Sequence, residues 1–395
     1  MAWLCTRDRC RVASGARALL ALCWFGGVAS FASSCSDESD ALSVSANAHY
    51  LLVSQAGSTT LAVVDPKPGR VIQRIQVGSL PHRMLRDRSG QSVYAVLVGS
   101  QAVAEIDART LTLRRTLLTA EVPERRADGT TIEPHQSEHA FEHASCFDCH
   151  HAGGAMPVVV GERPVGIALS ADESLLYISH IRGALLSVID LASGRLLRSE
   201  RLPPSAAAVE AADLVRVGDN LVVALRPTQP STEPGVVRFL DSDTLQLVAE
   251  FATGSDPASL LALPERGCAL VSNFESDSVT ELCLGADPRK FIVTPGPLGS
   301  VRLDDGGAVL TLDYYSNAVS LVDLDTAQVT QLELNHAGRM YVNPTHAALD
   351  PSARIAYVVS SGTDGHLLAL DLRTRELSTA VPIDGLSFDV VTIPR

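Results

Sequence analysis

The stretch YLLVSQAGSTTLAVVD, residues 50–65, decides the fold, because its pattern recurs along almost the whole chain. It consists of an apolar strand, a polar turn and a second apolar strand that ends in Asp. Clear copies are VYAVLVGSQAVAEID (93–107), LLYISHIRGALLSVID (175–190) and VLTLDYYSNAVSLVD (309–323), and further copies span 221–241, 267–284 and 355–371. The pattern therefore occurs seven times, at a period of roughly 40–45 residues that is typical of repeat architectures.

A further strand separates the copies, and proline often introduces it, as at Pro81, Pro164, Pro257 and Pro344. Each repeat thus supplies four short strands of alternating polarity, and no segment of helical periodicity interrupts them. One such unit cannot bury both of its faces, but seven units arranged around an axis can. We predict an all-β fold, a seven-bladed β-propeller of four-stranded blades over residues 48–395. An array of β-sandwiches is the alternative.

The two ends of the repeat region favour closure into a ring. The first repeat lacks one strand, and the chain ends with a surplus strand, LSFDVVTIP (386–394). Pairing this strand with the first repeat leaves no open sheet edge. The repeated motifs resemble the YVTN-type β-propeller family, and the resemblance extends from residue 48 nearly to the C-terminus. It implies the propeller fold.

Residues 1–35 have the features of an export signal. Arginines at positions 7, 9, 11 and 17 precede an apolar run over residues 18–32, which is too short to span a bilayer comfortably and ends in small residues. The stretch ASSC, residues 32–35, is similar to a bacterial lipobox, in which Cys35 is lipidated, although Ala32 replaces the usual larger aliphatic residue. Plain secretion is the alternative. Both readings predict an exported protein of the periplasm or cell surface, with residues 36–47 as a polar tether. In the lipoprotein reading, the lipid anchor is its one membrane contact.

Charge and cysteine usage narrow the possibilities further. The formal charge of −13, from 45 acidic and 32 basic residues, disfavours non-specific binding of nucleic acid. Export to an oxidising compartment permits thiols to pair. Cys268 and Cys283 lie symmetrically about the turn at residues 274–277, and we predict a cross-strand disulfide between them. Two buried free thiols are the alternative.

One interval breaks the period of the repeats. Asp107 and Asp190 are about two repeats apart, and the surplus is an insertion at approximately residues 121–162 that contains ASCFDCHH (144–151). Cys-x-x-Cys-His is the attachment signature of c-type haem. Cys146 and Cys149 would bond to the two vinyl groups of one porphyrin, and His150 would lie under the iron as its proximal ligand. We predict one covalent haem c in this insertion.

Other readings of the motif stay open. A structural zinc site is one, because histidines recur at every fourth position before the cysteines (His135, His139, His143). A plain disulfide between Cys146 and Cys149 is another. The three histidines are also compatible with solvated positions on a surface helix.

In the expected propeller, the insertion joins an outer strand of one blade to the inner strand of the next. Connections of this class emerge on one face, together with five of the six histidines outside the insertion (His82, His180, His336, His346, His366). Candidates for the sixth iron ligand are Met156 in the insertion, Met84 and Met340 in neighbouring loops, and His82 and His346 near the channel. A methionine ligand would favour electron transfer, whereas an open position would permit small-ligand chemistry.

The leading functional hypothesis is a monohaem cytochrome that exchanges one electron with a redox partner protein, with the propeller as its docking platform. One alternative is a haem- or metal-dependent oxidoreductase, peroxidase-like, that acts at the central channel. Another is a binding or adhesion propeller in which the cysteine pair is structural. The sequence contains no Gly-x-Ser-x-Gly element and no phosphate-binding glycine loop, so these motifs favour no other chemistry.

Overall fold

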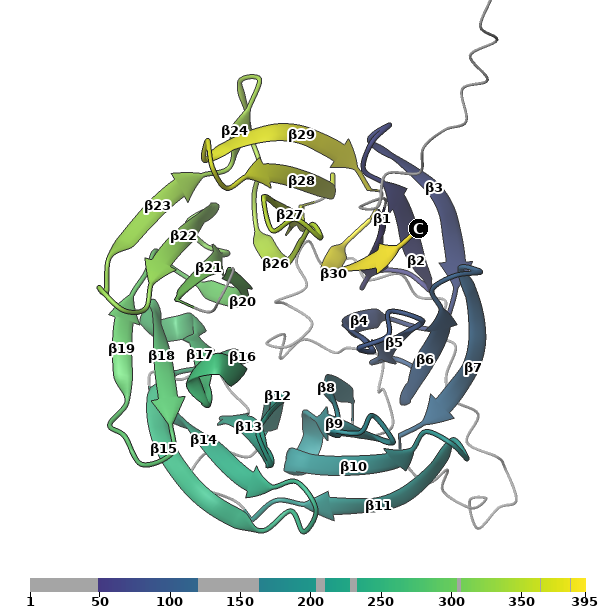
Figure 1. Cartoon of the computed structure of the whole chain (residues 1–395), viewed down its shortest axis with the longest axis vertical. Coiled ribbons are helices and arrows are strands. Elements are labelled where there is room, and N and C mark those ends of the chain that lie inside the picture. Colours follow the sequence, from purple (N-terminus) through teal and green to yellow (C-terminus); the bar gives the residue numbers. More distant parts are fainter. Residues whose placement is uncertain are drawn as a thin grey trace, which may run out of the picture. The chain divides into compact units, whose positions relative to one another are not determined.

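Seven four-stranded antiparallel sheets surround a central channel in the computed structural model, which describes residues 49–119, 163–203, 210–227, 233–303, 307–362, 364–383 and 385–395 (Figure 1). The strands of each sheet, or blade, follow one another from the channel outward. The prediction of an all-β, seven-bladed propeller is confirmed. The export signal with Cys35, the tether, and the insertion with Cys146, Cys149, His150 and Met156 lie outside the described residues and stay predictions.

The first four blades are built from sixteen strands. Blade 1 contains β1 (His49–Gln55), β2 (Thr60–Asp65), β3 (Arg70–Gln76) and β30 (Ser387–Pro394). Blade 2 contains β4 (Pro81–Arg86), β5 (Ser92–Leu97), β6 (Ala102–Asp107) and β7 (Thr112–Leu118). Blade 3 contains β8 (Pro164–Leu169), β9 (Leu175–His180), β10 (Leu185–Asp190) and β11 (Arg195–Arg201). Blade 4 contains β12 (Glu210–Val217), β13 (Asn220–Arg226), β14 (Pro234–Asp241) and β15 (Leu247–Ser255).

Three further blades complete the ring. Blade 5 contains β16 (Pro257–Leu263), β17 (Cys268–Asn273), β18 (Ser278–Cys283) and β19 (Arg289–Ile292). Blade 6 contains β20 (Pro297–Leu303), β21 (Ala308–Asp313), β22 (Ala318–Asp323) and β23 (Val329–Glu333). Blade 7 contains β26 (Pro344–Leu349), β27 (Ile355–Ser360), β28 (His366–Asp371) and β29 (Glu376–Pro382). A small hairpin, β24 (Asn335–His336) and β25 (Arg339–Met340), lies between blades 6 and 7, and 3₁₀ turns occur at Arg182–Ala184, Pro264–Arg266 and Phe274–Ser276.

The end of the chain completes the first blade. Strand β30 pairs antiparallel with β1, so that Val390 lies opposite Val53 and Ile393 opposite Tyr50. The pairing joins yellow and purple segments at the inside of one blade in Figure 1. The predicted ring closure is therefore confirmed, and β1 has no unpaired edge toward the channel.

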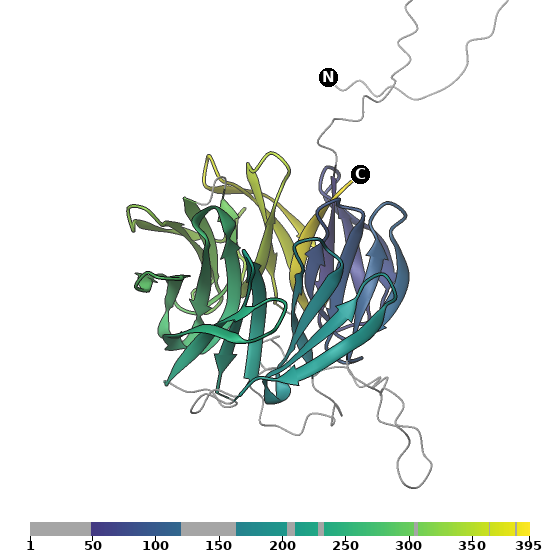
Figure 2. The same cartoon turned by 60° about the horizontal axis from the view of Figure 1, so that its bottom comes forward.

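Neighbouring blades stand side by side around the ring (Figure 2). The core consists of seven apolar layers, one between each pair of neighbouring blades. This follows from the twofold periodicity of a strand, which points successive side chains to opposite faces of the sheet. In β1, Leu52 packs in the layer toward blade 2, and Leu51 packs in the layer toward blade 7. The layer between blades 7 and 1 closes the ring, so both faces of every blade are buried.

The Asp that ends the third strand of six blades stabilises the turn after it. In blade 2, the carboxylate of Asp107 accepts hydrogen bonds from the backbone N–H groups of Arg109 and Thr110, each at 2.9 Å. Leu111 then adopts a left-handed backbone conformation and donates its N–H to the Asp107 carbonyl. The same carboxylate-capped turn follows Asp65, Asp190, Asp241, Asp323 and Asp371. Local hydrogen bonding of this kind explains why Asp recurs in the repeats.

A disulfide joins Cys268 and Cys283 across the β17–β18 hairpin, where the sequence symmetry predicts one. The two residues are directly opposite each other in the ladder and are fifteen positions apart in sequence. In blade 5 the disulfide stands in place of the turn-capping Asp of the other blades.

Replacement of both of these cysteines by alanine is expected to lower the free energy of unfolding by about 3 kcal/mol. This is the entropy that a cross-link over a fifteen-residue loop removes from the unfolded chain. Urea denaturation of the double variant and of the oxidised wild type measures the difference. A loss below about 0.5 kcal/mol would show that, in the unfolded chain, this segment is equally restricted without the cross-link.

No helix among the described residues is long and apolar enough to cross a membrane.

Candidate functional site

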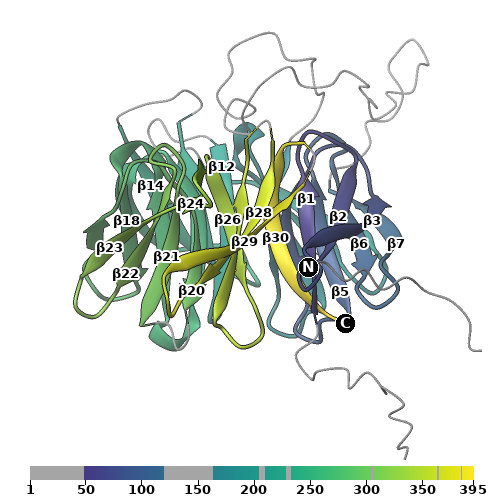
Figure 3. The same cartoon turned by 90° about the horizontal axis from the view of Figure 1, so that it is seen from above.

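The seven inner strands all begin on one face of the ring, which we call the mouth face. The hairpins between the second and third strands of each blade open on the same face, because antiparallel neighbours alternate in direction. The residues next to the insertion, Thr119 after β7 and Arg163 before β8, lie here as well. The C-terminus lies on the opposite face (Figure 3).

Five of the six histidines outside the insertion lie on the mouth face, as the sequence predicts. His82 and His346 are near the starts of inner strands β4 and β26, His180 ends β9, His366 begins β28, and His336 is in the small hairpin. His49 begins β1 at the opposite face.

A β-bulge occurs near the start of every inner strand, where its register with the second strand shifts. A bulge places an extra residue in one strand and redirects its side chains. At this bulge the seven strands contribute what we call the channel ring, which lies two positions after the first paired residue in six strands and three positions after it in β12. Its members are Arg83, Gly166, Asp213, Ser259, Gly299, His346 and Asp389. One position of the repeat therefore carries most of the polar groups of the channel.

The two acidic members of the channel ring connect neighbouring blades. Asp213 accepts a hydrogen bond from the N–H of Leu260 in the next inner strand, at 2.9 Å. Asp389 accepts one from the N–H of Met84, at 2.8 Å. Burial raises the pKa of both carboxyl groups, and the Arg83 guanidinium opposes that rise. Gly166 leaves room for Asp213, because a Cβ atom here would lie 2.9 Å from its Oδ1.

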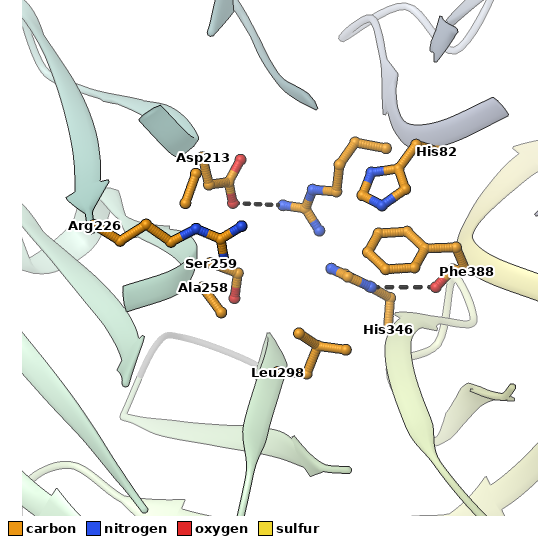
Figure 4. A pocket seen from close by; sticks show the side chains of 10 residues that line it. His82, Asp213, Arg226, Ala258, Ser259, Leu298, His346 and Phe388 are labelled. Atoms are coloured by element: carbon orange, nitrogen blue, oxygen red, sulfur yellow. Dashed lines mark hydrogen bonds and ion pairs between the residues drawn. The ribbon is translucent and has the colours of Figure 1, made fainter. Parts of the chain in front are cut away.

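A small pocket lies at the channel mouth, with space for a few water-sized molecules (Figure 4). Its walls combine charged, imidazole and apolar side chains from inner strands and from the end of β13. The lining residues are His82, Arg83, Ala212, Asp213, Arg226, Ala258, Ser259, Leu298, His346 and Phe388.

The Phe388 ring separates the two imidazoles of the pocket. It stacks on His82 at a centroid distance of 3.5 Å and packs at a tilt against His346 at 4.6 Å. Both imidazoles are buried, and burial lowers the pKa of each well below the usual value, with a further contribution from the positive charge of Arg83. Both histidines are therefore neutral at physiological pH.

The hydrogen bonding of His346 fixes its tautomer. Nδ1 lies 3.1 Å from the carbonyl oxygen of Phe388 and must donate to it, because a carbonyl cannot donate. In the neutral ring Nε2 then carries a lone pair, and this buried atom has no hydrogen-bond partner among the described residues. Ser259 Oγ, also in the pocket wall, likewise has no partner within the described part of the chain.

Two guanidinium groups converge on the same pocket. Arg83 pairs with Asp213 at 3.1 Å. Arg226 is buried and pairs with Asp256 at 3.1 Å and with Glu210 at 3.5 Å. Each guanidinium has five N–H donors, so these contacts leave donors that can serve a ligand.

The described candidates for a sixth iron ligand lie in different parts of the propeller. His82 and His346 both line the pocket at the channel mouth. Met340 is 60 % exposed on β25 and is not among the residues that line the pocket. Met84, expected in a loop, is instead buried in strand β4, in the apolar layer between blades 1 and 2. Met84, Met340, His82 and His346 therefore stay predictions as iron ligands, because the insertion that would hold the haem lies outside the described residues.

Sequence reasoning missed three components of the pocket: Asp213, Arg226 and Ser259. Ser259 lies two residues after Pro257, as His346 lies two after Pro344, so alignment of the proline-led strands could have found it. The inner strand of Asp213 lacks the leading proline, and Arg226 ends a second strand, so neither follows that signal.

The flanks of the insertion are anchored to blade 3. Ser187 Oγ donates a hydrogen bond to the carbonyl of Thr119 at 2.7 Å, and His180 Nε2 donates to the same Oγ at 2.9 Å. The backbone N–H of Ile181 donates to the carbonyl of Arg163 at 3.0 Å. His180 is fully buried, and burial, then the charge of Arg201, lowers its pKa to about 3.

This buried histidine predicts a loss of stability in acid. Because its pKa is lowered in the folded state, the unfolded chain binds an extra proton below about pH 6.5, and stability falls from there toward pH 3. In H180Q, an amide N–H can still donate to Ser187. Between pH 7.5 and pH 5 the wild type should lose about 2 kcal/mol more unfolding free energy than H180Q. Urea denaturation at both pH values measures this, and equal losses would contradict a neutral His180.

These features define the class of the protein: a seven-bladed β-propeller with a polar pocket at the mouth of its channel. No family model matches the chain, and no curated protein matches it. Among solved structures, it is similar to a functionally unknown protein from Desulfotomaculum acetoxidans DSM 771, at 10 % identity and a TM-score of 0.62, over 87 % of this chain and 99 % of that one.

Two further solved structures have the same fold. Kuenenia stuttgartiensis hydrazine synthase is 14 % identical, with a TM-score of 0.57 over 85 % of this chain and 92 % of that one. The dihydro-heme d1 dehydrogenase NirN, in complex with DHE, is also 14 % identical, with a TM-score of 0.53 over 87 % of this chain and 75 % of that one. At such identities the likeness is one of fold.

Proposed function

We propose that this protein is an exported monohaem c-type cytochrome that transfers one electron to or from a redox partner protein. The observation that carries the proposal is the sequence CFDCH at residues 146–150, in an insertion behind an export-type N-terminus. Cys146 and Cys149 would hold the porphyrin through thioether bonds, and His150 would ligate the iron. The haem supplies the redox chemistry, and the protein sets its exposure and potential.

The propeller supports this proposal as a rigid platform. Both flanks of the insertion are hydrogen-bonded to blade 3, through the carbonyls of Thr119 and Arg163. The insertion therefore starts and ends at fixed points on the mouth face. Function grafted between the elements of a regular scaffold is common, because the scaffold positions a segment that need not build its own core.

The similar structures give the proposal limited support. One of them, NirN, is a dihydro-heme d1 dehydrogenase, so the propeller fold occurs in at least one protein of haem chemistry. The likeness supports no residue-level transfer, and the proposed roles of Cys146, Cys149 and His150 come from their own spacing. Lipidation of Cys35 would hold the protein at a membrane surface, where a redox partner could dock.

A pyridine haemochrome assay tests the proposal on protein exported by a host with c-type maturation. We expect a c-type α band, equivalent to one haem per chain, that persists after acid–acetone extraction. A colourless protein that contains zinc would instead support a metal site formed by the cysteines and His135, His139 or His143. A colourless, metal-free protein would favour a binding propeller.

A further inference from the structure

We propose that the pocket at the channel mouth is a binding site for a small organic acid that is anionic and carries a hydroxyl group, such as a 2-hydroxycarboxylate. The described residues of the site come from the propeller, and the proposal uses no residue of the insertion. The proposal is therefore independent of the haem.

The acceptor at the base of the site is His346. The residue is only 4 % exposed, and its Nδ1 is committed to the Phe388 carbonyl. The lone pair on Nε2 consequently lacks a donor among the described residues. A buried acceptor without a donor costs roughly 1–3 kcal/mol, which a ligand hydroxyl would recover. Figure 4 shows the unpaired side of this ring directed toward the middle of the pocket.

The opposite part of the ligand would face Arg83 and Arg226. Two guanidinium groups directed into one small pocket match the geometry of a carboxylate, which accepts paired N–H bonds. Ser259 Oγ adds a hydroxyl without a partner in the described chain. Ala258, Leu298 and the Phe388 ring would contact the carbon atoms.

The positive charge of Arg83 acts on the histidine side of the pocket. Arg83 contributes positive potential at both imidazoles and lowers the pKa of each, after burial. The carboxylates near the pocket are already engaged: Asp213 by an ion pair with Arg83, Asp389 by the charge of the same Arg83, and Glu210 and Asp256 by Arg226. The same two arginines disfavour a metal ion at Nε2, because a cation there would lie among guanidinium groups.

Calorimetric titration of the mature full-length protein with three probes tests the proposal. Glycolate has a carboxylate and a hydroxyl, acetate lacks the hydroxyl, and glycolamide lacks the charge. We expect glycolate to bind at least about tenfold more tightly than either of the others, since each lost interaction is worth about one hydrogen bond. The haem-free variant C146A/C149A should bind glycolate equally well, which separates this proposal from the haem proposal.

Two variants identify the residues. H346N keeps an N–H donor for the Phe388 carbonyl but removes Nε2, so it should weaken glycolate binding about tenfold and leave acetate binding within about twofold. S259A should weaken glycolate binding about fivefold without loss of stability, because Ser259 Oγ has no protein partner in the described structure. The matched control is S272A, a buried serine of β17 outside the pocket, which should bind as the wild type does.

Several results would overturn the proposal. Equal affinity for glycolate and acetate would contradict the proposed bond between the ligand hydroxyl and His346. Equal affinity for glycolate and glycolamide would contradict the proposed preference for an anion. Absence of saturable binding for all three probes would show that the pocket holds only water. If H346N does not fold, the comparison of glycolate binding by S259A and by its control S272A still tests the proposed site.

Discussion

In a variant in which Cys146 and Cys149 are both alanine, covalent haem should be absent from the exported protein, while the propeller should remain folded. The thioether bonds require the two thiols, and no strand of the seven blades comes from the insertion. Haem content, from the pyridine haemochrome, should fall from one per chain to less than a tenth of that. The melting transition of the β-structure, followed by circular dichroism, should persist.

The matched control is C268A/C283A, which also removes two cysteines of the exported chain. It loses the β17–β18 disulfide but should retain its haem, because blade 5 is remote from the insertion in sequence and in the ring. Covalent haem that persists in C146A/C149A would contradict the proposed attachment. Loss of haem from both double variants to the same extent would point to a folding defect.

Replacement of His150 should affect the haem differently from replacement of the two cysteines. In His150→Ala the porphyrin should stay covalently attached, but the iron should lose its proximal ligand. The absorption spectrum should shift, and added imidazole should restore it, because imidazole can replace the missing ring at the iron. An unchanged spectrum would exclude His150 as the ligand.

Deletion of residues 386–395 should abolish the folded propeller. The deletion removes β30, whose Phe388, Val390 and Ile393 are each at most 4 % exposed. Burial of such side chains contributes about 1.5–3 kcal/mol each, so the loss of about 5–9 kcal/mol is comparable with the whole stability of many domains, about 5–15 kcal/mol. The deletion also exposes the inner edge of β1 and removes the Asp389 link to β4.

A rearranged chain provides the control for this deletion. Residues 386–395 are moved to a position before His49 and joined to it by a short turn, which is possible because Pro394 lies opposite His49 in the ladder. All strand pairings of blade 1 are then restored in a different chain order. We expect this variant to melt cooperatively, and the simple deletion to show no cooperative transition and to be degraded by protease. A deletion variant that melts as the wild type does would contradict the role of β30 in closure.

The sequence is sufficient to predict the architecture because interactions between residues that are close in sequence determine the strands and turns of each repeat. The Asp at the end of the third strand in six blades caps a turn with its own carboxylate, which is a short-range effect that a single sequence reveals. The missing strand at one end and the surplus strand at the other identify the closing pair. The disulfide follows from the symmetry of Cys268 and Cys283 about one turn.

The pocket could be predicted only in part, because it depends on contacts between distant blades. The sequence indicates that His82 and His346 lie near the channel, but not that Phe388 separates them. The β-bulge that places Asp213 in the channel ring is a register shift without a leading proline to indicate it, unlike the bulge at Ser259, which follows Pro257. Arg226 contributes to the pocket from the end of β13, and its position in the repeat gives no indication of this role.

The central claim is that one haem is covalently attached to this chain, and the intact mass of the mature protein tests it most directly. The protein is exported by a host that assembles c-type cytochromes, denatured, and measured by mass spectrometry. We predict the mass of the processed polypeptide plus that of one haem, in the wild type and in C268A/C283A but not in C146A/C149A. A wild-type mass equal to that of the polypeptide and its lipid alone would contradict the account.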